Sequence, residues 1–118
     1  MSVDFRPMGS AATYSAQDYH DGRTGDTQRL RFISDAGHCW LAVPLVTVYE
    51  YGLEPRISMY SYMDARRGLA YLEEDCDAPL FLRVLHDRGI EPSFEDVYDG
   101  DVSFIRRLPS FRPRPEHF

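Results

Sequence analysis

The chain has 118 residues, of which 43% are hydrophobic and 14% aromatic, so it can build one small core and is not globally disordered. Its formal net charge is −6, and residues 29–105 form the acidic part, with seven Arg against fourteen Asp and Glu. This balance argues against direct binding of duplex DNA by the core, because phosphates require clustered basic side chains.

Residues 1–28 show no apolar period of two or of 3.6 residues, which predicts a flexible N-terminal arm. The first residues lack the apolar segment of a signal peptide, and no apolar run reaches the roughly 18 residues that a membrane-spanning helix needs. We therefore expect a soluble cytoplasmic protein without membrane contact, in which Cys39 and Cys76 are free thiols.

Alternation of polar and apolar residues between turn residues predicts six strands. They are expected at 29–33, 38–43, 56–62, 69–72, 93–98 and 102–108. A short helix should begin at Pro44 and end at Gly52. A second helix, capped by Asp75 or Asp77, should end at Gly89.

The resulting order β-β-α-β-β-α-β-β contains hairpins rather than long crossovers, and Asp99-Gly-Asp101 is a strong signal for the last hairpin. The sequence therefore predicts an α+β fold in which an antiparallel sheet carries two helices on one face. The domain would span 29–108. Three prolines in residues 109–118 predict an extended basic tail.

Four carboxylates precede the second expected helix within five residues. They are Glu73, Glu74, Asp75 and Asp77. One cap and one first-turn charge would satisfy a helix N-terminus, so the surplus favours a cation or a basic partner. Because no EF-hand-like spacing is present, neither a metal nor another cofactor is predicted.

A second acidic group follows on the last expected hairpin, without a compensating Arg. It contains Glu91, Glu95, Asp96, Asp99 and Asp101. Two acidic patches can imitate a nucleic acid backbone and occupy an Arg-lined groove on another protein. A solvated face that only maintains solubility would explain the same pattern.

Three tyrosines are further candidates for partner binding: Tyr60, Tyr62 and Tyr71. Alternation places Tyr60 and Tyr62 on one face of the sheet. If the helices cover the other face, these two rings form an aromatic platform that a partner could contact.

Asp35, His38 and Cys76 permit an alternative, a small thiol-dependent or hydrolytic enzyme. A thiol at a helix N-terminus has a lowered pKa, and His38 could act as its base. No oxyanion-hole glycine motif accompanies these residues, so no catalytic residue is assigned. Zinc bound by His38, Cys39 and Cys76 is disfavoured, since adjacent strand residues point to opposite faces.

Residues 31–44, 56–62 (RISMYSY) and 71–78 (YLEEDCDA) resemble a family of small proteins encoded by bacteria, phages and plasmids. The resemblance spans residues 29–109 and includes Ser103-Phe-Ile-Arg106, while the position of Cys39 is usually glycine in that family. The family carries no established chemistry. It implies a setting on mobile elements, where small acidic proteins bind host machinery, anti-CRISPR and other anti-defence proteins among them.

We therefore expect a non-enzymatic inhibitor of host defence that occupies a basic groove on a host protein or nucleoprotein complex. Besides the enzyme, a housekeeping interaction module remains an alternative. In that case the Arg-Pro tail, residues 106–118, would contact RNA or a protein groove.

Overall fold

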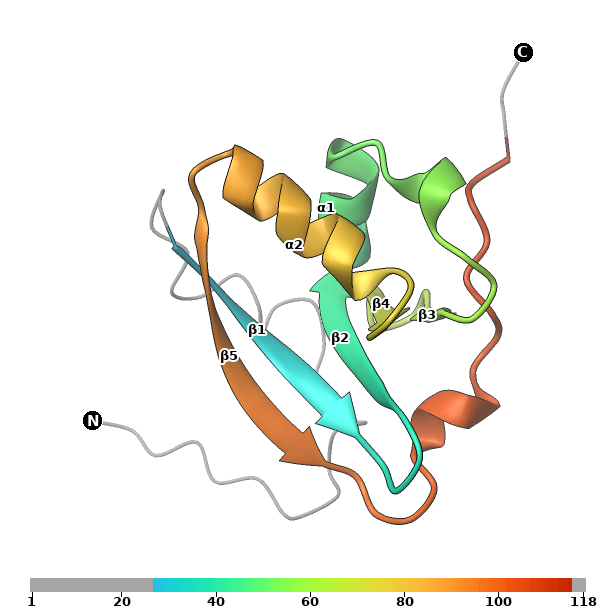
Figure 1. The fold of residues 1–118 in the computed structure, drawn as a ribbon. Helices are drawn as coiled ribbons and strands as arrows, with labels where there is room; N and C mark the ends of the chain where they lie inside the picture. Colours follow the sequence, from blue (N-terminus) through green and yellow to red (C-terminus); the bar gives the residue numbers. More distant parts are fainter. Residues whose placement is uncertain (1–26, 116–118) are drawn as a thin grey trace.

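The structure, a computed structural model, describes residues 27–115, so almost all of the expected N-terminal arm lies outside the described residues. Residues 27–115 form five β-strands and two α-helices (Figure 1). The strands are β1 (Thr27–Ser34), β2 (Cys39–Pro44), β3 (Tyr62–Asp64), β4 (Leu69–Glu73) and β5 (Glu91–Tyr98). The helices are α1 (Leu45–Glu50) and α2 (Ala78–Asp87), with short 3-10 helices η3 (Glu54–Arg56) and η4 (Phe104–Arg107) in the connections.

The strands form one sheet in the order β3-β4-β2-β1-β5. The pairs β1–β2, β2–β4 and β3–β4 are antiparallel, whereas β5 runs parallel to β1 with Phe94 opposite Leu30. The predicted α+β class is confirmed and the sheet is mostly antiparallel, but the expected antiparallel pairing is wrong at β5. The reason is α2, which carries the chain back across the sheet, so that β5 starts beside the start of β1 (Figure 1).

Local turn signals place most elements correctly. Gly52 and Gly89 follow α1 and α2 with φ of 67° and 71°, the left-handed conformation in which glycine ends helices. The strand expected at 56–62 is wrong, because η3 and a loop replace it and only Tyr62 enters β3.

The strand expected at 102–108 is also wrong. The Asp99 N–H bonds the Ser34 carbonyl at 2.7 Å, which ends β5 beside β1. Gly100 then takes a φ of 80°, and the Ser103 hydroxyl accepts the Ile105 N–H and begins η4. The Asp-Gly pair therefore makes a turn into a 3-10 helix rather than a hairpin.

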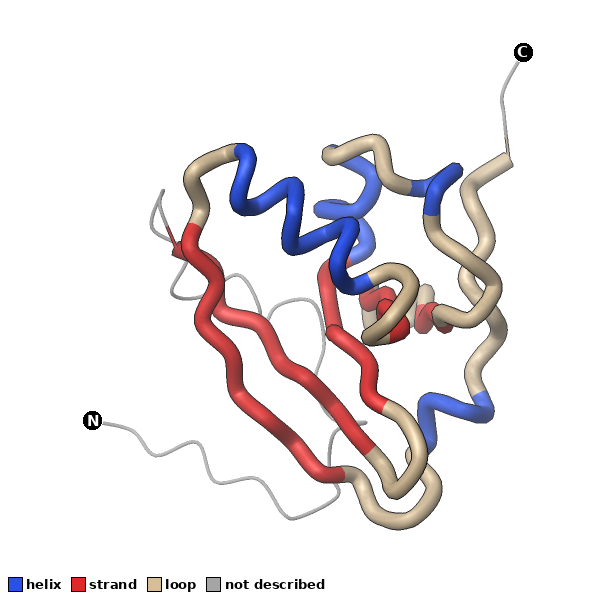
Figure 2. The backbone as a smooth tube through the Cα atoms, viewed as in Figure 1, coloured by secondary structure: helices blue, strands red, loops and turns tan. Residues whose placement is uncertain are grey.

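Both α-helices lie on one side of the sheet, here called the helix face (Figure 2). Leu45 and Val48 of α1 and Phe81 and Leu85 of α2 are buried there against apolar residues of the strands. Apolar residues that recur at helical spacing turn one stripe of each helix inward, as the sequence predicts.

The opposite face of the sheet carries a second apolar cluster, into which η4 inserts Ile105. Trp40 and Tyr71 are almost completely buried in this cluster, and Phe104 packs edge-on against Tyr71. The expected open tyrosine platform is therefore wrong over most of this face, because η4 covers it.

Residues 109–115 run along the domain as an extended chain. Phe111 is 4% exposed within the helix-face core, and its N–H bonds the Ser61 carbonyl at 2.8 Å. Further along, the Arg114 guanidinium lies 3.8 Å from the ring centroid of Tyr49 and bonds Glu54 at 2.6 Å. Neither helix in residues 27–115 combines the length and the apolar character needed to cross a bilayer.

Candidate functional site

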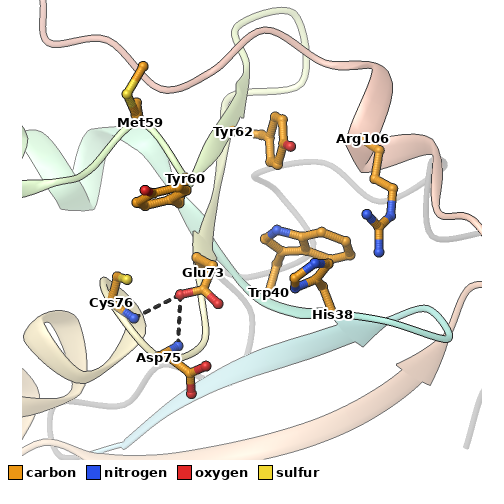
Figure 3. Close-up of a pocket in the computed structure, with 9 residues that line it drawn as sticks. All are labelled: His38, Trp40, Met59, Tyr60, Tyr62, Glu73, Asp75, Cys76 and Arg106. Atoms are coloured by element: carbon orange, nitrogen blue, oxygen red, sulfur yellow. Dashed lines mark hydrogen bonds between the residues drawn. The ribbon is translucent and has the colours of Figure 1, made fainter.

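A groove of about 280 Å³ opens at one end of the opposite face, between η4, the 58–61 loop and the β4–α2 connection (Figure 3). Nine residues line it: His38, Trp40, Met59, Tyr60, Tyr62, Glu73, Asp75, Cys76 and Arg106. Aromatic rings and carboxylates predicted as a partner-binding surface thus meet at one place, although they come from separate elements.

Trp40 forms the floor of the groove. It lies directly across from Glu73 in the β2–β4 ladder, and its ring contacts the Tyr62 ring edge-on with centroids 6.2 Å apart. The His38 ring lies 6.0 Å from it on the other side. Because Trp40 is 2% exposed, these contacts fix its orientation, whereas Tyr60 is 66% exposed and stands at the rim.

Glu73 is held by the turn that follows β4. Its Oε1 accepts the N–H groups of Asp75 at 2.9 Å and Cys76 at 2.8 Å (Figure 3). A carboxylate that accepts two backbone donors is fixed in position. The groove therefore contains a fixed negative charge next to its aromatic floor.

Asp77 does not cap α2 with its side chain, contrary to the sequence-based expectation. The side chain is buried and accepts hydrogen bonds from the Ser58 N–H at 3.1 Å, from the Ser58 hydroxyl at 2.7 Å and from the Ser61 hydroxyl. The Ser61 hydroxyl in turn accepts the Glu73 N–H at 2.9 Å. Asp77 is therefore out of a partner's reach and instead positions the loop that carries Tyr60.

Arg106 closes the other side of the groove and is paired with Asp35. Its Nε and a terminal nitrogen donate to the two Asp35 oxygens at 2.5 and 2.9 Å, and its guanidinium lies 5.5 Å from the Trp40 ring centroid. The Arg106 guanidinium holds the pKa of Asp35 far below its ordinary value. Since Asp35 neutralises Arg106, Glu73 and Asp75 leave the groove acidic.

The remaining candidates are more dispersed. Tyr71 is 0% exposed, so a docked partner cannot contact it. Glu74 and Asp75 are exposed, and Asp75 lines the groove. Asp99 is buried, where it accepts the Ser103 hydroxyl at 2.6 Å and the Phe104 N–H at 3.2 Å.

Among the β5 carboxylates, Glu95 bonds Arg31 at 2.8 Å, so the expectation that this acidic group has no compensating Arg is wrong. Asp96 and Asp101 are exposed. Glu74 and Asp96 both act on Cys39: burial, followed by these two charges, raises the pKa of its thiol to about 11. One member of each acidic group, Glu74 and Asp96, therefore lies near Cys39.

The surroundings of Cys76 do not favour the thiol-dependent enzyme considered from the sequence. His38 and Cys76 line the same groove, but a hydrogen bond with Glu73 raises the pKa of Cys76, contrary to the lowered value expected. Asp35 is committed to Arg106 and to backbone N–H groups of Gly37 and Ser103. Because the thiolate is the nucleophile, a raised pKa disfavours thiol catalysis. Within residues 27–115, no group of three or more His, Cys, Asp or Glu is arranged to hold a metal ion.

A second hollow of about 500 Å³ lies along α2. It contains the exposed side chains of Arg56 and Arg83 beside Pro79 and Asp87. Two arginines in the lining would repel a basic partner, so this hollow is not assigned to the partner-binding surface.

Sequence reasoning named Tyr60, Tyr62, Glu73 and Asp75 but did not assign Trp40 or Arg106 to the site. Trp40 reads as an ordinary core residue, and its place opposite Glu73 depends on the register of two strands separated by a helix and a hairpin. Arg106 belongs to the Ser103–Arg106 motif, which was the one available signal for it. Comparisons with protein-family models, curated proteins and solved structures find no match to this chain.

Proposed function

We propose that this chain is a non-enzymatic binding protein that contacts a basic surface of its partner with the groove and the carboxylates beside it. One observation carries the proposal. Tyr60 and Tyr62 meet Glu73 and Asp75 in a single groove, and Glu74, which lies between these two carboxylates in the sequence, is exposed. Aromatic rings provide contact area at protein interfaces, and carboxylates provide charge complementarity to a basic partner.

Within this proposal the partner is a host-defence protein or nucleoprotein complex whose nucleic-acid-binding groove is blocked, and the protein acts in the cytoplasm. Support comes from the acidic balance of residues 29–105 and from the resemblance to proteins of mobile elements. Such grooves are lined with Arg and Lys, so an acidic surface competes with nucleic acid for them. The raised pKa of the Cys76 thiol disfavours the thiol-dependent alternative.

The test is a binding competition. Candidate nuclease and CRISPR effector complexes would be incubated with the chain at low salt, followed by pull-down and by measurement of target-DNA binding. We expect complex formation that weakens as salt rises and that displaces DNA.

The Glu74→Arg, Asp75→Arg double variant should abolish the complex, since both side chains are exposed and Asp75 lines the groove. A matched double variant, Glu50→Arg with Asp87→Arg, makes the same change of charge at exposed sites elsewhere and should still bind. Equal loss in both variants would reduce the effect to net charge, and no complex at low salt would overturn the proposal.

A further inference from the structure

The molecule already contains one complete guanidinium site. Arg114 lies over the Tyr49 ring, and its Nε and terminal nitrogen bond Glu54 at 3.1 and 2.6 Å. Arg88 likewise lies 4.1 Å from the Tyr51 ring centroid. A tyrosine face with a carboxylate beside it is therefore the arrangement that binds Arg114 within this chain.

The groove offers the same two groups to another molecule. Tyr60 stands at the rim, and the fixed Glu73 carboxylate lines the same groove (Figure 3). The arginine already present, Arg106, lies over Trp40 and directs its donors to Asp35. A cation from outside would thus meet an aromatic face and a carboxylate without competing with Arg106 for either.

The placement of the carboxylates selects the type of cation. Glu73 uses Oε1 for two backbone donors and also hydrogen-bonds the Cys76 thiol, a weak donor that a charged guanidinium can displace, and Asp75 lines the groove nearby. A planar guanidinium can donate from different nitrogens to two separate carboxylates while its face stacks on a ring. An ammonium group is compact and strongly hydrated, so it gains less from the same surroundings.

The size of the groove limits what can enter. Pockets that enclose drug-sized ligands have volumes of about 300–1,000 Å³, so an open groove of about 280 Å³ suits one long side chain. We infer that the groove is a receptor for a single arginine side chain of the basic protein partner, stacked on Tyr60 and bonded to Glu73 and Asp75. This inference rests on the proposed function, because it takes the partner to be a basic protein.

Trp40 makes the inference directly measurable, since it is the single tryptophan of the chain and lies in the groove. The full chain would be titrated with a short Gly-Ser peptide that contains one arginine, with Trp40 fluorescence as the signal. Matched peptides would carry citrulline, which lacks the charge, or lysine in place of the arginine. We expect saturable binding of the arginine peptide and affinities at least about tenfold lower for citrulline and severalfold lower for lysine.

Two variants localise the site. Glu73→Gln keeps an oxygen for the Asp75 and Cys76 N–H groups and removes only the charge, and Tyr60→Ala removes an exposed ring. Each variant should lower the affinity for the arginine peptide by about three- to tenfold. Glu50→Gln and Tyr98→Ala make the same changes at exposed positions outside the groove and should leave the affinity unchanged.

Equal binding of the three peptides, or of wild type and Glu73→Gln, would overturn the inference, as would the absence of any arginine-peptide binding. If the arginine peptide fails while a defence complex still binds and Glu74→Arg, Asp75→Arg abolishes that binding, the arginine receptor is wrong and the proposed function stands. If a defence complex also fails to bind, both are wrong.

Discussion

Two regions of the molecule combine tyrosine with carboxylate, and they differ in the origin of the cation. In the tail region, Tyr49 and Glu54 hold Arg114, which the chain itself delivers. In the groove, Tyr60 and Glu73 stand beside an arginine that is already bound to Asp35. The same chemistry therefore contributes to the packing of the tail in one place and is available for recognition in the other.

The difference lies in the cost of bringing the groups together. Phe111 is buried three residues before Arg114, so the tail is already held close to Glu54 when the ion pair forms. A partner's arginine has no such tether and must overcome the loss of translational and rotational freedom. The groove consequently needs further contacts, which the neighbouring exposed carboxylates Glu74 and Asp75 can supply.

The largest change should come from Phe111→Ala, because a phenyl ring in the helix-face core is lost. We expect the free energy of unfolding to fall by about 3–5 kcal/mol, measured by urea denaturation. The tail should also detach. Arg114 would then leave Tyr49, and the Ser61 carbonyl would lose its hydrogen bond from the Phe111 N–H. Arg112→Ala, an exposed neighbour, is the control. Similar stability of the two variants would mean that the tail does not contribute to the core.

Asp35→Asn tests the pair that neutralises Arg106. The Asp35 side chain is fully buried, and removing its charge should cost about 3 kcal/mol in urea denaturation. It should also weaken arginine-peptide binding, because Arg106 would then add an uncompensated positive charge to the groove. Unchanged affinity would show that Arg106 is electrostatically remote from the ligand.

The pH dependence of stability should report on the same Asp35–Arg106 ion pair. The folded-state pKa of Asp35 lies below its ordinary value of 3.8. The charged carboxylate therefore stabilises the folded state at pH values above 3.8. This stabilisation is lost as the pH falls from 3.8 toward the folded-state pKa. Wild type should therefore lose stability steadily below about pH 4, and Asp35→Asn should lose less. Parallel pH profiles for the two proteins would contradict this assignment.

Asp77→Asn should have an intermediate effect. The carboxylate accepts hydrogen bonds from Ser58 and Ser61, and an amide can replace only part of them. We expect a loss of about 1–3 kcal/mol together with weaker arginine-peptide binding, since Tyr60 lies in the loop that these serines fix. Asp87→Asn, at an exposed position, should change neither quantity.

Arg114→Ala should change stability least, since the ion pair is partly exposed. The variant leaves Tyr49 and Glu54 without their arginine. It should therefore bind a second arginine peptide at this site, in addition to the one in the groove. Calorimetry would measure the stoichiometry, and the double variant Arg114→Ala, Glu54→Gln should return it to one. A stoichiometry of one in Arg114→Ala would show that the ring and carboxylate need the tether.

Much of the fold could be predicted because it depends on local signals. Pro44 and Gly52 bound α1, Gly89 follows α2, and turn residues at 66–68 lead from β3 into β4. Each signal acts within a few residues, where φ preferences and the position of missing donors decide the structure.

The remaining features depend on partners that are far apart in the sequence. Arg106 and Asp35 are 71 residues apart, and Asp77 and Ser58 are 19 apart, so no period or turn signal announces either pair. At Asp99-Gly-Asp101 a strong hairpin signal is overridden, because the Ser103 N–H bonds Asp35, 68 residues away, where η4 begins. For the same reason several groove residues could be predicted individually, but the sequence could not predict that they lie together around Trp40.

The parallel β1–β5 pair also sets an order of assembly. Arg31 and Glu95 are 64 residues apart, so this pairing closes by far the longest loop in the sheet, and loop closure costs more entropy as the loop lengthens. On a ribosome, β1, β2 and β4 can join while residues 91–98 are still being synthesised. The acidic edge strand is therefore the last strand to dock, and until then the outer edge of β1 remains open to other chains.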